Sequence, residues 1–304
     1  MSDIVSVGHL TIDRIFLPNR SVPFMVLGGS PTYVSLAASC LDARVSVVSK
    51  VGGDFPAAYS WWLKEEGIDL SGVVRVENGQ TTRFELKYNS DLSERTLRLV
   101  SKAPPITVDD MPNSIKAKAI HLAPIVGEIT YEVAQKLRTS TEVLSLDPQG
   151  LVRNFDENGN ITYGVLSDKR VLDLLNIYKS SLVEIEAVTT QPNLKSAIKA
   201  VHDRGVKVVI VTLGMKGAAL SVEGDFYNIP ACKPEKIIDP TGAGDAFIGG
   251  FLTEYINGAN YLRCACVASA VASLVVEAQG PTFSCDKTKI YQRARALYEK
   301  EIKE

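Results

Sequence analysis

The most informative segment of the chain reads Ile238-Asp239-Pro240-Thr241-Gly242-Ala243-Gly244-Asp245-Ala246-Phe247-Ile248-Gly249-Gly250-Phe251. Its glycines at 242 and 244 let successive backbone N–H groups turn toward one point and form a nest. The apolar run after Asp245 predicts a helix that ends near Gly258. Because a helix N-terminus carries unpaired N–H groups and a partial positive charge, this segment is expected to bind an anion, for which phosphate is the natural candidate.

Asp245 falls in the first turn of that predicted helix. One interpretation is that its carboxylate only complements the helix dipole. The other is catalytic, because a carboxylate beside a bound phosphate repels it. Such a placement makes sense if the carboxylate takes a proton from a hydroxyl that attacks the phosphate. The residues by themselves favour this second interpretation.

The composition of the 304-residue chain excludes several classes of protein. Its 33 Lys and Arg against 35 Asp and Glu give a net charge of −2, which offers no electrostatic basis for binding nucleic acid or a membrane surface. The longest uncharged apolar stretch, from Cys264 to Val276, has 13 residues and is expected to form a buried helix. A helix that spans a membrane needs ~20 residues. No secretory signal is visible, so we expect a cytoplasmic protein.

The cysteines of the chain are Cys40, Cys232, Cys264, Cys266 and Cys285. They are odd in number and scattered, with no C-x-x-C pair, so the sequence indicates neither a disulfide framework nor a zinc site. Cys264 and Cys266 fall in the predicted buried helix and are expected to pack there as small apolar residues.

Short runs rich in Val and Ile recur between segments with a helical pattern, and they predict a parallel sheet covered on both faces by helices. The runs are Ile4–Val7, Val45–Val48, Ala119–Leu122, Val143–Leu146, Leu182–Val183 and Val206–Val211. Between them, residues 31–41 place apolar side chains on one helical stripe, and Asp54 is expected to N-cap a helix that stops at Gly67. The predicted fold class is therefore α/β.

One region breaks this alternation of strands and helices. Residues 81–88 and 94–100 alternate polar with apolar side chains and are separated by a turn signal, a pattern typical of antiparallel strands with one solvated face. We expect a small sheet that protrudes from the main domain, with strands contributed by roughly residues 12–27 and 73–100. Residues 1–304 are otherwise expected to form a single domain.

The segment from Asp239 to Asp245, with Phe247 and Gly249-Gly250 behind it, closely resembles the C-terminal signature of the ribokinase-like, or phosphofructokinase-B, family of carbohydrate and nucleoside kinases. Shorter stretches that resemble this family occur in the expected order along nearly the whole chain. They are Gly8–Asp13, Gly28-Gly29, Val51–Asp54, Gly67–Val73, Val211–Gly217 and Ala272–Val275. The resemblance implies the ribokinase-like three-layer α/β/α fold with a small β-sheet lid. It also implies transfer of the γ-phosphoryl group of ATP, with Mg²⁺, to a hydroxyl.

The resemblance further implies roles for individual residues. Asp245 matches the catalytic base. The anion hole that stabilises the transferring phosphoryl group is matched by the backbone of Gly242, Ala243 and Gly244. On the acceptor side, the matching positions are Asp13, Gly28 and Gly29. On the nucleotide side, they are Thr212, Gly214, Gly217 and Thr241. The protruding strands match a lid that excludes water from the reaction, and a homodimer formed through that lid is left open.

One departure from the family pattern concerns the metal. Family members commonly carry an Asn, two further residues and a Glu near the phosphate-bound Mg²⁺. We align Ser181 with that Asn and Glu184 with that Glu, which would then act on the metal through water. The alternative register places Val183 and Glu186 at these positions.

A second departure concerns the acceptor. The lysine and asparagine pattern of sugar kinases is replaced by Ser30-Pro31-Thr32-Tyr33, so ribose in its usual pose is not expected. At the carboxyl end of a central strand, the run with Asp147, Gln149 and Arg153 offers several hydrogen-bonding groups, although Arg153 is alternatively a surface residue on a turn. With Gly8–Arg14, this run resembles the archaeal and plant inositol-kinase-like branch, which implies a cyclic polyol such as myo-inositol.

Two alternatives to a polyol kinase stay open. A nucleoside kinase would use the same base on a ribose 5′-hydroxyl. A non-catalytic nucleotide- or polyol-binding protein would retain the fold, but it would gain nothing from a base at Asp245. The sequence holds no G-x-x-x-x-G-K-[ST] and no G-x-G-x-x-G after its first strand, which argues against a Walker-type site and a dinucleotide oxidoreductase.

Overall fold

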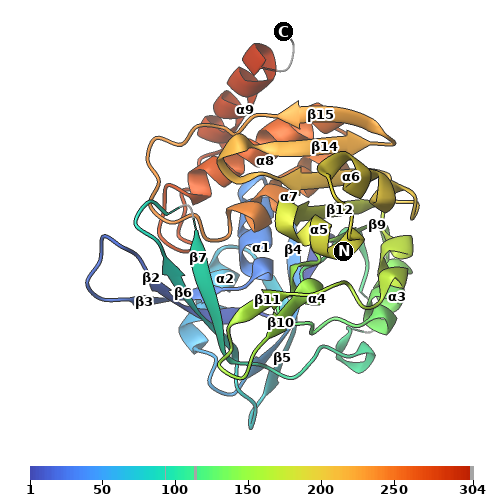
Figure 1. The fold of residues 1–304 in the computed structure, drawn as a ribbon. Coiled ribbons are helices and arrows are strands. Elements are labelled where there is room, and N and C mark those ends of the chain that lie inside the picture. The colour runs from blue at the N-terminus through green and yellow to red at the C-terminus, as the bar shows by residue number, and fades with distance from the viewer. Residues whose placement is uncertain (93, 113–114, 302–304) are drawn as a thin grey trace.

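The main sheet contains most strands of the molecule. The computed structural model describes residues 1–92, 94–112 and 115–301, and within them nine strands form one sheet in the order β15-β14-β13-β12-β9-β8-β1-β4-β5 (Figure 1). Their bounds are β1 Ser2–Val7, β4 Val45–Gly52, β5 Asp69–Val76, β8 Ala117–Leu122, β9 Thr141–Leu146, β12 Ile177–Ser181, β13 Val208–Thr212, β14 Ala218–Val222 and β15 Asp225–Ile229. Every pair from β5 to β13 is parallel, and β14 and β15 extend one edge as antiparallel strands.

Helices cover both faces of this sheet, which confirms the predicted three-layer α/β fold (Figure 1). One face carries α1 Ser30–Cys40, α7 Ala243–Ile256 and α8 Tyr261–Val275, with α9 Lys287–Glu301 packed on α8. The other carries α3 Tyr131–Arg138, α5 Leu182–Thr189 and α6 Leu194–His202. The remaining helical segments are α2 Ala57–Glu65, α4 Gln149–Val152, η1 Val108–Asp110, η2 Lys169–Leu174 and η3 Gly214–Lys216.

The core lies on both sides of the sheet, as the apolar runs predicted. In β1, Ile4 packs into the cluster under α7 and α8, whereas its neighbour Val5 packs into the cluster under α3, α5 and α6. On α1, the predicted stripe is buried, with Val34 and Ala37 fully inaccessible. Burying each such aliphatic side chain of Val or Ile size contributes about 1.5–3 kcal/mol, so strand and helix hold each other in place.

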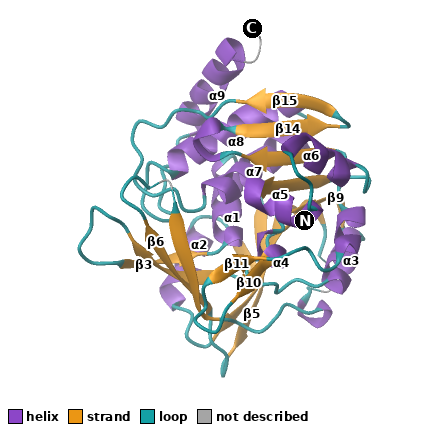
Figure 2. Ribbon diagram, in the orientation of Figure 1, coloured by secondary structure: helices purple, strands orange, loops and turns teal. Residues whose placement is uncertain are grey.

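A small sheet stands apart from the main one (Figure 2). Its order is β3-β2-β6-β7, with bounds β2 Thr11–Phe16, β3 Phe24–Gly28, β6 Thr82–Tyr88 and β7 Arg95–Ser101. Two antiparallel pairs, β2–β3 and β6–β7, are joined by a parallel β2–β6 pair. A further short pair, β10 Arg153–Phe155 and β11 Ile161–Tyr163, lies beside β7. Residues 73–76, which we had grouped with the small sheet, belong instead to β5 in the main sheet.

Two local expectations were wrong. Leu182-Val183 is not a strand but the first turn of α5, because Ser181 and Glu184 form a reciprocal capping box that ends β12 and starts the helix. Asp54 does not cap α2. Its carboxylate accepts hydrogen bonds from the Thr81 N–H and hydroxyl, both at 2.7 Å, and pairs with Arg83, so it connects the main sheet to the small sheet.

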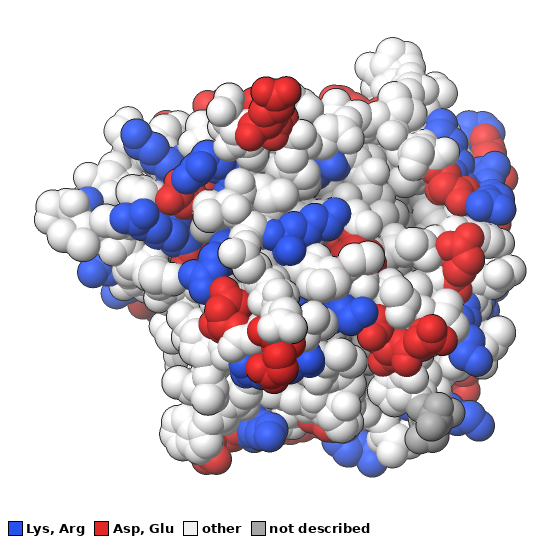
Figure 3. Space-filling view, turned by 90° about the horizontal axis from the view of Figure 1, so that it is seen from below, with Lys and Arg blue, Asp and Glu red and all other residues white. Residues whose placement is uncertain are grey.

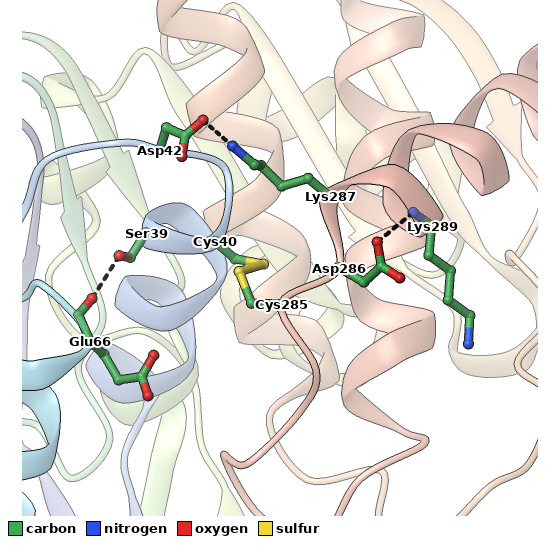
Figure 4. Close-up of a disulfide and its surroundings, with 8 residues drawn as sticks. All are labelled: Ser39, Cys40, Asp42, Glu66, Cys285, Asp286, Lys287 and Lys289. Carbon is green, nitrogen blue, oxygen red and sulfur yellow. Dashed lines mark hydrogen bonds and ion pairs between the residues drawn. A yellow bond between two sulfur atoms is a disulfide. The ribbon is translucent and has the colours of Figure 1, made fainter.

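The structure also contains a disulfide that the cysteine spacing did not indicate. Cys40, at the end of α1, pairs with Cys285, just before α9, across 245 residues (Figure 4). Their Cα atoms lie 5.2 Å apart because the segment that leads into α9 packs against the end of α1, and an ion pair between Asp42 and Lys287 lies beside them. Cys264 and Cys266 are buried and free, as expected for packing residues.

In the part of the chain that the structure describes, no helix has the length and apolar character needed to cross a membrane. The surface carries both signs of charge. On the face shown in Figure 3, basic and acidic side chains are interspersed, in agreement with the net charge of −2.

Candidate active site

The predicted nest forms at the N-terminus of α7. Gly242 is the residue before the first helical turn and adopts a left-handed conformation with φ of 78°. A Cβ at this position would lie 2.2 Å from the ring of Tyr33, so only glycine fits. The backbone of residues 242–244 therefore forms the N-terminus of α7 beside Asp245, and the Ala243 nitrogen lies 3.4 Å from the Pro240 carbonyl oxygen.

Asp245 is held in place by two neighbouring side chains. The Ser30 hydroxyl donates a hydrogen bond to Oδ1 at 2.5 Å, and the Gln149 amide donates to the same oxygen at 3.2 Å. Ser30 opens α1 and Gln149 opens α4, so helices from distant parts of the chain orient this one carboxylate. An acceptor-only oriented carboxylate next to an anion nest can receive a proton from a bound hydroxyl.

Asp13 lies on the small sheet and faces the same place. Its carboxyl is buried and accepts a hydrogen bond from the Thr11 hydroxyl at 2.6 Å. Burial raises its pKa to about 6. Gly28 lies across the β2–β3 pair, where a Cβ would come within 2.0 Å of Asp13 Oδ2, and Gly29 starts α1 with φ of 91°. Gly28 thus leaves room for the Asp13 carboxylate, and Gly29 allows the sharp turn from β3 into α1.

The predicted acceptor residues divide into two groups. Gln149 contacts Asp245, and Arg153 lines the space in front of it, with a buried Nε that has no protein partner. Asp147 instead forms a buried ion pair with Lys179, with Nζ and Oδ2 2.5 Å apart. Its carboxylate is therefore committed to Lys179, whereas we had expected it to contact the acceptor.

Two hollows meet at Asp245. The larger, about 300 Å³, is lined by residues that include Asp147, Lys179, Glu184, Thr212 and Gly244. The smaller, about 40 Å³, lies under the small sheet and is lined by residues that include Asp13, Ser30, Phe84, Leu86, Leu97 and Arg153. Ligand sites usually measure about 300–1,000 Å³, so the smaller hollow is well below and the larger one at the lower end of that range.

The predicted nucleotide residues lie at separate places. Thr212, at the end of β13, lines the larger hollow. Gly214 and Gly217 both have positive φ in the turn of η3, and a Cβ on Gly217 would meet the Ile229 carbonyl oxygen at 2.0 Å. Gly217 is therefore also required by the packing of β15. Thr241 bonds through its hydroxyl to the Tyr88 hydroxyl, at 2.8 Å, and so connects the nest to the small sheet.

Glu184, and not Glu186, faces the larger hollow. Glu184 is 6% exposed, whereas Glu186 is an exposed residue of α5. Among the described residues, no cluster of His, Cys, Asp or Glu could hold a metal ion by itself. In nucleotide sites, Mg²⁺ is held mainly by phosphates and waters, with one or two carboxylates assisting. Glu184 and Asp245 line the larger hollow and are chemically suited to such a role.

Several residues of this site were not found from the sequence. Arg95 lines both hollows and donates to the Tyr88 hydroxyl at 3.0 Å. Leu86 and Leu97 pair across β6 and β7 and face the smaller hollow. The polar–apolar alternation along residues 82–88 indicates which side chains share a face, but it does not indicate what that face covers.

An oriented carboxylate beside an anion nest at a helix N-terminus, on a three-layer α/β fold, defines a phosphotransferase that acts on hydroxyl groups. The chain belongs to the pfkB family of carbohydrate kinases, whose family model matches residues 1–289. A ribokinase of Arabidopsis thaliana, solved with ribose and ATP, is similar in structure, with 22% identity and a TM-score of 0.78 over 97% of this chain and 99% of its own.

The relatives of this chain include both nucleoside kinases and inositol kinases. The chain is 30% identical to a cytidine kinase of Thermococcus kodakarensis over 269 residues, which covers 87% of this chain and 92% of the relative. It is 26% identical over 283 residues to an inositol 3-kinase of Arabidopsis thaliana, with coverages of 90% and 74%. A solved structure with a TM-score of 0.80 and 23% identity covers 98% of this chain and 99% of its own. That structure is a pyrophosphate-dependent myo-inositol-1 kinase converted into a myo-inositol-3 kinase by replacing an asparagine and a serine with leucines.

Proposed function

We propose that this protein is an ATP-dependent, Mg²⁺-assisted kinase of the cytoplasm that phosphorylates myo-inositol, and that the 3-hydroxyl is the one phosphorylated. The single observation that carries the choice of hydroxyl is the pair of leucines, Leu86 and Leu97, that lines the acceptor side of the site. They face each other across the β6–β7 pair, eleven residues apart. The two leucines introduced into the converted inositol kinase are also eleven residues apart.

The leucines act by limiting how a polyol ring can lie. An apolar wall offers no hydrogen bond, and a ring hydroxyl pressed against it would lose one, at a cost of about 1–3 kcal/mol. Asp13, Gln149 and Arg153 provide hydrogen-bonding groups elsewhere around the hollow. The ring therefore turns its hydroxyls toward these polar groups, and this choice decides which hydroxyl reaches Asp245.

The catalytic steps follow from the geometry around Asp245. Its Oδ1, oriented by Ser30 and Gln149, takes the proton of the attacking hydroxyl. The N–H groups of residues 242–244 stabilise the negative charge on the transferring phosphoryl group. Bound Mg²⁺ would neutralise phosphate charge, with Glu184 orienting its waters. Closure of the small sheet excludes water, which prevents transfer of the phosphoryl group to water.

A nucleoside is the second candidate acceptor, and one observation favours it. Phe84 lines the acceptor hollow and offers an aromatic side chain against which a base could pack, and its ring centroid lies 6.2 Å from that of Phe155 behind it. The identity with a cytidine kinase points the same way.

The two candidates are separated by initial rates of purified protein with ATP and Mg²⁺ on myo-inositol, cytidine, other nucleosides, ribose and fructose 6-phosphate. We expect myo-inositol to have the highest kcat/KM. A nucleoside that exceeds it tenfold would overturn the polyol assignment but leave a kinase. Pyrophosphate replaces ATP in a parallel series and is expected to be the poorer donor. Absence of product with every acceptor would favour a binding protein.

The position of phosphorylation is tested separately. The 1- and 3-phosphates of myo-inositol are mirror images, so chiral chromatography of the product is required. We expect the 3-phosphate from the parent protein. The double variant Leu86→Asn/Leu97→Ser should shift the product toward the 1-phosphate, and Val100→Ser, on the exposed side of β7, should leave it unchanged. An unshifted product from the double variant would contradict the role of the leucines.

A further inference from the structure

Glu128 carries a buried carboxylate that the proposed mechanism does not use. It lies between β8 and α3, and none of its surface is exposed. Within the described residues, the carboxylate forms no ion pair and accepts hydrogen bonds only from backbone N–H groups. Removing a charge from water is costly unless it is paired or fully hydrogen-bonded. Stability alone is therefore a poor explanation for a carboxylate at this place.

The carboxylate of Glu128 joins two segments that are far apart in the sequence. Its Oε1 accepts from the His9 N–H at 2.9 Å, and the Ile125 N–H is shared between Oε1 at 3.0 Å and Oε2 at 2.9 Å. Oε2 also accepts from the Val126 N–H at 2.8 Å. His9 follows β1, and Ile125 and Val126 follow β8, the parallel neighbour of β1. Glu128 therefore ties the chain that leaves β1 to the chain that leaves β8.

Both segments lead to the acceptor side of the candidate site. The first continues into β2, where Thr11 and Asp13 line the smaller hollow, and the second supplies Ile125 to the same hollow. Ile125 also packs in one apolar cluster with Phe84 and Leu86 of the small sheet. Among the described residues that line the larger hollow, none comes from either segment. Glu128 is therefore connected to the acceptor side of the site and not to its nucleotide side.

The local structure around Ile125 explains how one carboxylate can hold this segment. Gly127 has a positive φ of 73°, and this turn lets the Glu128 side chain fold back toward the preceding N–H groups. The Pro124 carbonyl accepts from the Gly150 N–H of α4 at 2.9 Å, and a Cβ on Gly150 would lie 2.4 Å from the Ile125 nitrogen. The backbone at Ile125 is therefore held both by α4 and by Glu128.

We propose that Glu128 is a positioning residue for the acceptor, whose carboxylate fixes Ile125 at its place in the acceptor hollow relative to the strand that carries Asp13. The proposal rests on the proposed kinase function but not on the identity of the acceptor. Glu128 lines neither hollow, so it acts through Ile125. A wall that is already ordered binds a ligand without the entropy loss of ordering it. Loss of the carboxylate should therefore weaken binding of the acceptor and leave binding of the nucleotide unchanged.

The test uses Glu128→Gln in the full chain, with the exposed Glu142→Gln as a matched control. Glutamine has the size of glutamate, but its NH₂ group cannot accept a hydrogen bond, so one of the bound N–H groups loses its partner. We expect KM for the acceptor to rise about tenfold, the loss expected when a buried hydrogen bond to a charged group is broken. KM for ATP, and the affinity for a non-hydrolysable ATP analogue, should change less than about twofold. Glu142→Gln should match the parent in all three.

This split between the two substrates separates positioning from a merely structural role. A variant that was only less stable would contain less folded protein, so kcat would fall with every acceptor while both KM values stayed at those of the parent. An acceptor KM within about twofold of the parent, or equal changes in the KM values of acceptor and ATP, would overturn the proposal.

A double-mutant cycle tests whether Glu128 acts through Ile125. Ile125→Ala removes the side chain that lines the hollow and keeps the backbone that Glu128 holds. In this background the place of the segment matters less to the acceptor, so Glu128→Gln should raise the acceptor KM only about two- to threefold further, because residues that act together are not additive. The full tenfold effect of Glu128→Gln in both backgrounds would contradict the proposed route.

A failure of the proposed function can be told apart from a failure of this inference. If the parent protein transfers no phosphoryl group to any acceptor, the proposed function fails, and calorimetry of myo-inositol and cytidine with the ATP analogue present decides the role of Glu128. The role holds if Glu128→Gln weakens binding of the acceptor at least about fivefold more than binding of the analogue. It fails if both affinities change alike, or if the parent binds neither acceptor.

Discussion

At the scale of single residues, the proposed mechanism assigns different roles to two carboxylates in different surroundings. Asp245 is half-buried and held by Ser30 and Gln149, an arrangement that suits a base. Asp13 is fully buried beside Thr11, and its pKa is raised to about 6. In the mechanism that we propose, Asp245 receives a proton, and Asp13 binds acceptor hydroxyls when it is ionised.

The role of Asp245 is tested by Asp245→Asn. The amide has the shape of the carboxylate but cannot take a proton, so we expect kcat to fall about 10²–10⁴-fold. The affinity for ATP should stay within a few-fold of that of the parent. Single-turnover rates together with nucleotide binding by calorimetry measure the two quantities. The exposed Asp225→Asn provides the control. Turnover near that of the parent would remove Asp245 from the mechanism.

The raised pKa of Asp13 predicts a pH dependence. Below about pH 6 its carboxyl is mostly protonated, so it loses its charge and one oxygen becomes a donor, which weakens its acceptance of hydrogen bonds from hydroxyls. We therefore expect kcat/KM for the acceptor to rise with pH through about 6 and then level off. Asp13→Asn should remove this inflection, and it should weaken binding of the acceptor far more than binding of ATP. A pH profile of Asp13→Asn that keeps the inflection would assign it to another group.

The raised pKa of Asp13 also affects stability, which it lowers as the pH rises, whereas activity rises with pH. The pKa of Asp13 in the folded protein lies above the 3.8 of an unperturbed aspartate, so between about pH 4 and pH 6 the native state binds more protons than the unfolded state. This carboxyl therefore stabilises the fold least above pH 6. Asp13→Asn should raise the thermal midpoint at pH 8 and have little effect at pH 4.

At the scale of elements, the junction of β12 and α5 has two functions. The capping box of Ser181 and Glu184 ends the strand and starts the helix, and the same Glu184 faces the larger hollow. The local turn from strand to helix therefore also places Glu184 at the candidate site. The short α4 acts similarly, because its first residue, Gln149, contacts Asp245.

Glu184→Gln tests this junction. Glutamine can still accept from the Ser181 N–H, so the fold should persist, but the charge that orients metal-bound waters is lost. We expect the Mg²⁺ concentration for half-maximal activity to rise about 10-fold or more. Glu186→Gln, exposed on the same helix, should change it less than twofold. The reverse order would support the alternative register.

At the scale of the whole molecule, the disulfide joins the beginning and the end of the chain. Cys40 belongs to α1, which delivers Ser30, and Cys285 precedes the C-terminal α9. Because the bond closes a loop of 245 residues, it restricts the unfolded chain strongly. It therefore stabilises the arrangement of α1 relative to α8 and α9.

Reduction of this bond should lower the free energy of unfolding by about 2–5 kcal/mol. Denaturant unfolding with and without a thiol reductant measures the change, and Cys40→Ser should reproduce it without reductant. Cys232→Ser, at a free cysteine, is the control. Equal stability of the reduced and oxidised protein would show that the bond contributes nothing.

The sequence by itself determined those features that depend on neighbours along the chain. The nest at 242–244, Asp245 in the first turn of α7, the stripe of α1 and the apolar strands are local patterns, because N–H geometry and side-chain periodicity extend over only a few residues. The tertiary structure alone decided which distant groups meet. Lys179 with Asp147, Leu86 opposite Leu97, and Cys40 with Cys285 are each set by strand register or helix packing. No local pattern indicates such partners, because each contact is the joint result of packing the whole core.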